Sequence, residues 1–259
     1  MTDTAFDFAL PETRRRTEKP RSSGQTMMMD IGMPLGAQQD WLDVIGPFFD
    51  MAKLVTGTAS LYHADYLKRK LDLYAKYEIK PFIGGGFLER IFDRNGLDGV
   101  RQLYDECLRL GIAAIEVSET ILPIDLKDRL ILIERAIDAG LEVHAEVGTK
   151  IEDPSSISKL TDEVGILLEA GAHNITVEGA ELMSNGVANQ ELCDKIAEAF
   201  DLDSILFELC GPWLPRTHSW ETYSVMRFLV ATFGPNVNIG NATPELVVEI
   251  ETQRRGLNE

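Results

Sequence analysis

Carboxylate side chains recur at or just after the ends of short apolar segments along this chain of 259 residues. If they converged they would repel one another, because like charges in a partly desolvated site raise each other's pKa. A hard divalent cation such as Mg2+ binds carboxylate oxygens and suits such a set better than zinc. The alternative is that each carboxylate pairs with a neighbouring Lys or Arg in a structural network. We predict Mg2+ as cofactor, with these ligands: Asp30, Glu116, Glu146, Glu178 and Glu208.

Lysines accompany these carboxylates. Lys53 lies inside the mostly apolar run DMAKLVTG, where an unpaired charge would cost several kcal/mol. We therefore expect it to face a carboxylate, a ligand or a polar site. Lys150 follows EVGT, and taken alone it is more typical of a solvated loop residue. No P-loop, nucleophile elbow or HxxxH spacing is present, so the chemistry would use a metal, cations and a general acid or base.

The elements that must position these residues alternate along the chain. Segments with helical spacing, such as 98–111 and 125–140, each close on a glycine and separate short apolar runs. This alternation predicts parallel strands joined by helices, and eight units predict a closed (β/α)8 TIM barrel. The alternative is an open doubly wound sheet, but no GxGxxG fingerprint is present. The predicted strands are 26–30, 50–55, 79–84, 113–118, 141–148, 173–179, 204–210 and 236–241.

The barrel prediction explains where the carboxylates fall. Active sites of such barrels lie at the C-terminal ends of the strands, where we expect six carboxylates, counting Glu89 beyond the glycines at 84–86. One domain, 1–259, accounts for the whole chain, with 1–25 as a short irregular N-terminal arm.

Composition excludes several classes of partner. The formal net charge is −17, which argues against nucleic acid and against an anionic membrane surface. No apolar run approaches the roughly 18 residues that a membrane span needs, so we expect a cytoplasmic protein. Its three cysteines lack CxxC spacing and predict free thiols. Trp213 and Trp220 could serve a homo-oligomer interface or a lid.

Several blocks, in order over nearly the whole chain, resemble the phosphosulfolactate synthase family of coenzyme M biosynthesis. The most specific is the long block at 234–257. The blocks are KPRSSGQT (19–26), AKLVTGTAS (52–60), IGGGFLE (83–89), AAIEVSE (113–119), EVGTK (146–150), VEG (177–179), LFE (206–208) and GPNVNIGNATPELVVEIETQRRGL (234–257).

The resemblance implies a barrel enzyme, a carbon-sulfur lyase, that adds sulfite to phosphoenolpyruvate with Mg2+ and gives (2R)-2-phospho-3-sulfolactate. The family's general acid is the last lysine of EVGKK, which falls on Lys150. Lys53 would be a cationic neighbour that lowers the pKa of Lys150. The sequence departs from the family pattern at Ile31, where the family has lysine, and at Ala180, where it has arginine. Arg216 could replace lost positive charge.

Substrate contacts are predicted from the same blocks. Arg21 would hold an oxyanion with its planar guanidinium over the barrel mouth. Gly240 and Asn241 follow the eighth strand, where barrels form phosphate sites from backbone N–H groups. Gly85 and Ser118 complete the set. Two alternatives stay open: a related lyase or isomerase acting on another enol or 2-oxo acid, and a non-catalytic homologue with a protein partner.

Overall fold

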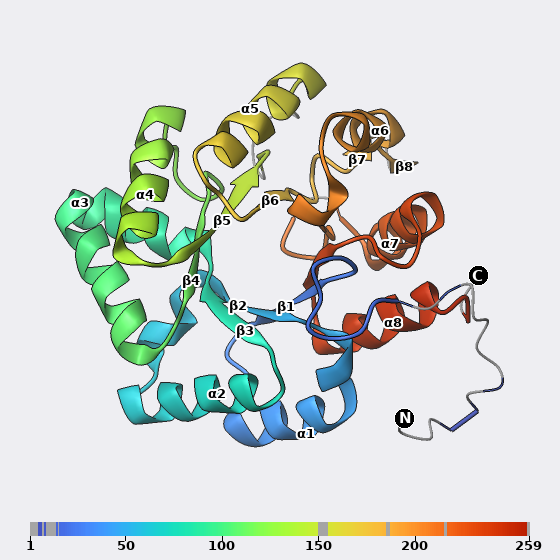
Figure 1. The fold of residues 1–259 in the computed structure, drawn as a ribbon, viewed down its shortest axis with the longest axis horizontal. Helices are drawn as coiled ribbons and strands as arrows, with labels where there is room; N and C mark the ends of the chain where they lie inside the picture. Colours follow the sequence, from blue (N-terminus) through green and yellow to red (C-terminus); the bar gives the residue numbers. More distant parts are fainter. Residues whose placement is uncertain are drawn as a thin grey trace.

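Eight parallel strands close into a barrel in the part of the chain that the structure describes (Figure 1). This computed structural model describes residues 5, 6, 8, 14, 16–149, 155–184, 187–214 and 217–257. The strand order around the barrel is β1-β10-β9-β6-β5-β4-β3-β2, which confirms the predicted (β/α)8 architecture. The strands are β1 (Thr26–Asp30), β2 (Met51–Leu54), β3 (Lys80–Ile83), β4 (Ala114–Val117), β5 (Glu142–Val147), β6 (Asn174–Val177), β9 (Ile205–Glu208) and β10 (Ile239–Ala242).

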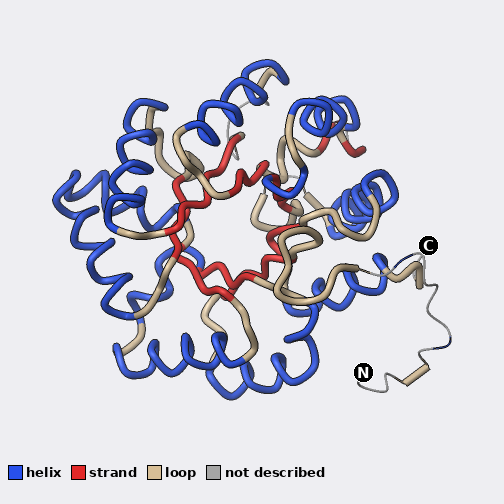
Figure 2. The backbone as a smooth tube through the Cα atoms, viewed as in Figure 1, coloured by secondary structure: helices blue, strands red, loops and turns tan. Residues whose placement is uncertain are grey.

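The helices surround the ring of strands (Figure 2). Short 3-10 helices, η3 (Gly46–Phe48), η4 (Val55–Leu61) and η5 (Leu202–Ser204), and a small hairpin, β7 (Met183–Ser184) with β8 (Val187–Ala188), lie in the connections. None of the helices in the described ranges is long and apolar enough to cross a membrane. The α-helices are α1 (Leu35–Ile45), α2 (Ala64–Lys76), α3 (Gly85–Leu110), α4 (Leu126–Ala139), α5 (Ile157–Glu169), α6 (Gln190–Ala199), α7 (Ser219–Phe233) and α8 (Pro244–Arg254).

Capping residues set the helix ends that the sequence pattern predicts. The carboxylate of Asp125 accepts the backbone N–H of Asp128 at the start of α4, and Gly140 ends this helix with φ 92°. The predicted helix at 98–111 is the second part of α3, which begins earlier, at Gly85, and changes direction at Gly96 with φ 60°.

The barrel interior has an apolar floor. A separate cluster of buried apolar side chains fills it: Met27, Met51, Phe82, Ala114 and Leu206. Side chains two residues apart on a strand point to the same face. Lys53, Glu116 and Glu208 therefore face the interior one layer nearer the C-terminal strand ends. The alternation of the strands thus stacks ionisable side chains directly on the apolar floor.

The described residues Arg16 and Arg21 of the N-terminal arm contact the opposite end of the barrel. Arg21 donates to Asp50 at 2.8 Å and to the carbonyl of Pro47 at 3.0 Å. Asp50 immediately precedes β2 and also accepts the backbone N–H of Thr26, so these contacts lie at the N-terminal edge of the strands. The prediction that Arg21 covers the barrel mouth was therefore wrong, because its guanidinium is fixed at the other end.

Arg16 strengthens this attachment. Its side chain, 3% exposed, forms ion pairs with Asp50 at 2.9 Å and with Glu251 of α8 at 2.8 Å. One carboxylate thus joins two arginines of the arm to the start of β1 and β2.

We expect Asp50→Ala to lower the free energy of unfolding by about 3–5 kcal/mol, because it leaves Arg21 without a carboxylate partner and Arg16 with Glu251 alone. Asp72→Ala is the control, since Asp72 pairs with Lys68 on the surface with both side chains more than 60% exposed. It should cost at most about 1 kcal/mol. Urea denaturation at neutral pH measures both, and equal losses would contradict the structural role of Asp50.

Candidate active site

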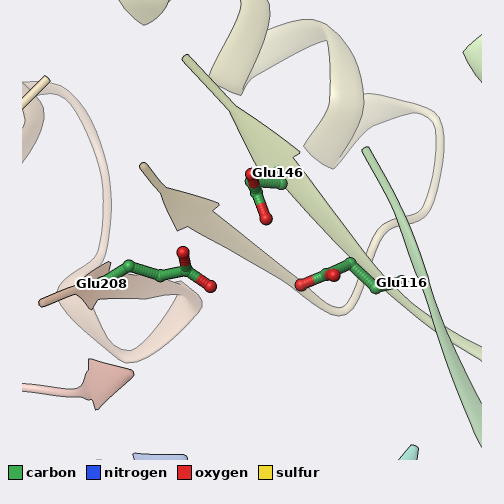
Figure 3. Close-up of side chains that lie close together, drawn as sticks. All are labelled: Glu116, Glu146 and Glu208. Carbon is green, nitrogen blue, oxygen red and sulfur yellow. The ribbon is translucent and has the colours of Figure 1, made fainter. Parts of the chain in front are cut away.

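Three glutamates meet inside the barrel near the C-terminal strand ends. Glu116 comes from β4, Glu146 from β5 and Glu208 from β9, and each is at most 1% exposed. One carboxylate oxygen of each lies within 4.8 Å of those of the other two. Figure 3 shows the three carboxylates pointing toward one another. The structure therefore brings together three of the five predicted metal ligands.

Lys53 of β2 reaches into this glutamate group. Its Nζ lies 2.8 Å from Glu116 Oε1, 2.9 Å from Glu208 Oε1 and 3.5 Å from Glu146 Oε2. Burial disfavours its charged form, but the three carboxylates overcome this and raise the pKa of Lys53 well above its ordinary value of 10.5. The expectation that Lys53 faces a carboxylate is confirmed, and it stays a cation.

The first turn of α3 holds Glu116. The backbone N–H of Gly85 donates to Glu116 Oε2 at 2.6 Å, and the positive end of the helix dipole favours this anion. Burial raises the pKa of Glu116, whereas Lys53 and the Gly85 N–H oppose that rise. A Cβ on Gly85 would lie 1.9 Å from Ser118 Oγ, so only glycine allows this close approach.

Asn241 supports Glu208 from the neighbouring strand. Its Nδ2 donates to Glu208 Oε2 at 2.5 Å, and its backbone has φ 56°, a conformation that asparagine tolerates better than most residues. Its Oδ1 is buried and has no hydrogen-bond partner in the described part of the chain. Gly240 faces the floor, where a Cβ would lie 2.3 Å from Leu206 Cδ2. Substrate contacts by Gly240 and Asn241 stay a prediction.

These residues fit a hard divalent cation. Three carboxylates and one ammonium leave the site with a formal charge of −2, which one Mg2+ would neutralise. Carboxylate and amide oxygens are the donors that Mg2+ prefers, and the Oδ1 of Asn241 adds an unused oxygen beside Glu208. Glu116, Glu146 and Glu208 would hold the ion.

Asp30 lies outside the glutamate group. Its Oδ2 accepts from Tyr74 at 2.8 Å and pairs with the buried Lys70 at 2.9 Å. Its Oδ1 accepts the backbone N–H groups of Gly32 and Met33. Because Oδ1 stabilises the loop after β1 and Oδ2 is bound to two side chains of α2, the prediction that Asp30 is a metal ligand was wrong.

Glu178 also lies outside the group of three. It is fully buried just beyond β6, and its Oε1 accepts the backbone N–H of Ala180 at 3.3 Å. Its role as a ligand stays a prediction.

Glu89 of α3 holds the loop after β4, which begins at Ser118. The Ser118 hydroxyl donates to Glu89, whose carboxylate also accepts the backbone N–H groups of Thr120, Ile121 and Leu122. The six carboxylates expected at the mouth therefore do not all converge, because this one stabilises a loop. A substrate contact by Ser118 or by the N–H of Gly85 would compete with these internal hydrogen bonds.

Lys150 and Arg216 lie outside the described residues. Sequence reasoning missed Glu181, which contacts the chain on both sides of 150–154. Glu181 is 2% exposed and accepts the backbone N–H of Thr149 at 3.1 Å and that of Ser155 at 3.2 Å. Burial raises its pKa, while these N–H groups oppose the rise. The only available signal was its position three residues after Glu178, on the loop that follows β6.

Comparisons with known proteins identify relatives of this chain over nearly its whole length. A phosphosulfolactate synthase of Methanothermobacter thermautotrophicus is 30% identical, covering 98% of this chain and 95% of that protein. One of Methanocaldococcus jannaschii is 28% identical, with coverages of 98% and 96%. The crystal structure of 3-hexulose-6-phosphate synthase from Salmonella typhimurium superposes with a TM-score of 0.53 at 16% identity, covering 90% of this chain and 98% of that chain, and this likeness supports the barrel fold alone.

The match to a family covers most of the sequence. Residues 14–259 fit the sequence profile of the family described as (2R)-phospho-3-sulfolactate synthase (ComA). The chain therefore belongs to the phosphosulfolactate synthase family of enzymes.

Proposed function

We propose that this protein catalyses the Mg2+-dependent addition of sulfite to phosphoenolpyruvate, giving (2R)-2-phospho-3-sulfolactate, a carbon-sulfur lyase reaction of coenzyme M biosynthesis. The observation that carries the proposal is the buried group of Glu116, Glu146 and Glu208 at the C-terminal end of a barrel whose family match runs from residue 14 to 259. A cytoplasmic location and a homo-oligomeric state stay predictions.

The chemistry needs positive charge and a proton donor. A divalent ion at the three glutamates would supply positive charge for the carboxylate of the enol phosphate. The sulfite sulfur forms a bond to the methylene carbon, and the electrons of the double bond move to the carbon that bears the phosphate. That carbon then takes a proton, which we assign to the ammonium of Lys150.

Lys53 fits this scheme as a permanent cation. Its pKa is raised by the glutamates that surround it, so it keeps its proton and is not the acid. If Lys150 lies close to it, this permanent charge lowers the pKa of Lys150 and makes that lysine a better proton donor. Arg21 is not among the proposed substrate contacts, because its guanidinium is engaged at the other end of the barrel. The proposed contacts are Gly85, Ser118, Gly240 and Asn241.

The proposed reaction can be followed directly in solution. Purified protein incubated with phosphoenolpyruvate, sulfite and Mg2+ should consume the vinyl protons of the substrate, followed by NMR. Lys150→Ala should slow this loss by about 100-fold or more, the usual contribution of a general acid. Lys159→Ala, an exposed lysine on α5, should leave the rate unchanged. No consumption by the wild-type protein at any Mg2+ concentration would refute the synthase assignment, and a fully active Lys150→Ala would refute the assigned acid.

The role of Glu181 can be tested by amide exchange. Replacing it by alanine removes the acceptor of the Thr149 and Ser155 N–H groups. A hydrogen bond to a charged group contributes about 1.5–3 kcal/mol, so amide exchange in a peptide covering 148–156 should become about tenfold faster or more.

Glu198→Ala is the matched control, because Glu198 pairs with Lys195 on the surface. Hydrogen exchange with mass spectrometry measures both variants. Unchanged exchange in Glu181→Ala would show that other contacts hold this part of the chain.

A further inference from the structure

We propose that Lys53 is a displaceable counter-ion: its ammonium holds Glu116, Glu146 and Glu208 together until a divalent cation binds, and then moves toward the barrel mouth. The inference rests on the metal site of the proposed function and does not depend on which substrates are used.

The ammonium of Lys53 and a metal ion bound by the three glutamates need the same space. Nζ lies within 3.5 Å of carboxylate oxygens from all three glutamates, and one oxygen of each glutamate lies within 4.8 Å of those of the other two. A bound Mg2+ sits about 2.0–2.1 Å from its oxygen ligands. An ion that binds two or three of these carboxylates would therefore lie against the ammonium, and the two cations would repel each other.

The three glutamates need a cation beside them whether or not a metal ion is bound. Three carboxylates that are at most 1% exposed cannot stay ionised side by side without nearby positive charge. Lys53 provides that charge to all three. After a divalent ion binds, the three carboxylates, the ion and the ammonium together are formally neutral, so charge balance keeps Lys53 near the site.

The side chain of Lys53 has space to move toward the barrel mouth. Its side chain is 7% exposed, whereas those of the three glutamates are at most 2% exposed, so it is the member of the cluster with most access to solvent. Its stem passes Gly84, where a Cβ would lie 3.3 Å from Lys53 Cε and 3.4 Å from Cγ. Glycine at this position leaves the flexible stem free of a neighbouring side chain, and the displaced ammonium would face an anion entering the mouth.

The test compares metal affinities without using the reaction. Isothermal titration with Mn2+ as the probe is performed on the full-length wild type, Lys53→Met and Lys80→Met. Lys80 is the control, because it pairs with Glu142 at the N-terminal end of β3 with its side chain 43% exposed. If the ammonium leaves the carboxylates about a tenth of the time, Lys53→Met should bind Mn2+ about tenfold more tightly. Lys80→Met should match the wild type.

Adding Glu208→Gln to each protein assigns the binding to this site, because it should weaken Mn2+ binding in every background. Equal or weaker binding by Lys53→Met, with clear binding by the wild type, overturns the counter-ion proposal and leaves the metal site standing. Absence of Mn2+ binding in both proteins overturns the metal site and the counter-ion proposal together.

A second measurement uses the wild type alone and so does not depend on the folding of Lys53→Met. In a crystal structure with Mn2+, located by its anomalous scattering, Nζ should lie beyond hydrogen-bonding distance of at least two of the three glutamates. An Nζ that keeps its three carboxylate contacts beside a bound Mn2+ overturns the proposal.

Discussion

The interior of this barrel depends on one electrostatic constraint, the compensation of three buried carboxylates by the ammonium of Lys53. Removing such charges from water is costly unless each finds a partner of opposite charge or a hydrogen-bond donor. The residues around the three glutamates supply these donors and the space that the contacts need. The N–H of Gly85 and the amide of Asn241 donate to Glu116 and Glu208, and the glycines at 84 and 85 leave room for these contacts.

The two ends of the barrel use the same types of ionisable residue for different purposes. At the N-terminal edge, Asp50 binds Arg16 and Arg21 and thereby attaches the arm. Arg254 of α8 is fully buried there and donates to backbone carbonyls, including those of Gly24 and Val237. Arginine suits this end because its planar group bonds several fixed acceptors at once. At the C-terminal end a flexible lysine is surrounded by glutamates that a metal ion could share.

The environment of each mouth residue decides whether it is available for chemistry. Asp30 and Glu89 are as buried as the three glutamates of the cluster, yet both oxygens of each already have partners. Asp30 Oδ1 accepts loop N–H groups and its Oδ2 pairs with Lys70 of α2, whereas both oxygens of Glu89 accept loop N–H groups. Such carboxylates stabilise the connections that position the site. Position 31, where the family that the sequence resembles has lysine, is here an isoleucine that is 71% exposed beside Asp30 and supplies no positive charge.

The sequence alone was sufficient to predict the fold, because eight alternating units with capping glycines permit few topologies. All eight predicted strands are present in the structure. It also placed Glu116, Glu146 and Glu208 at strand ends, since the period of two along a strand is a local property. It could not distinguish these three from Asp30 and Glu89, nor place Arg21 or find Glu181. Those outcomes depend on partners far apart in the chain, such as Lys70 for Asp30, Asp50 for Arg21 and Thr149 for Glu181. Local sequence thus determined which residues point into the barrel, whereas closure of the barrel decided which of their charges meet.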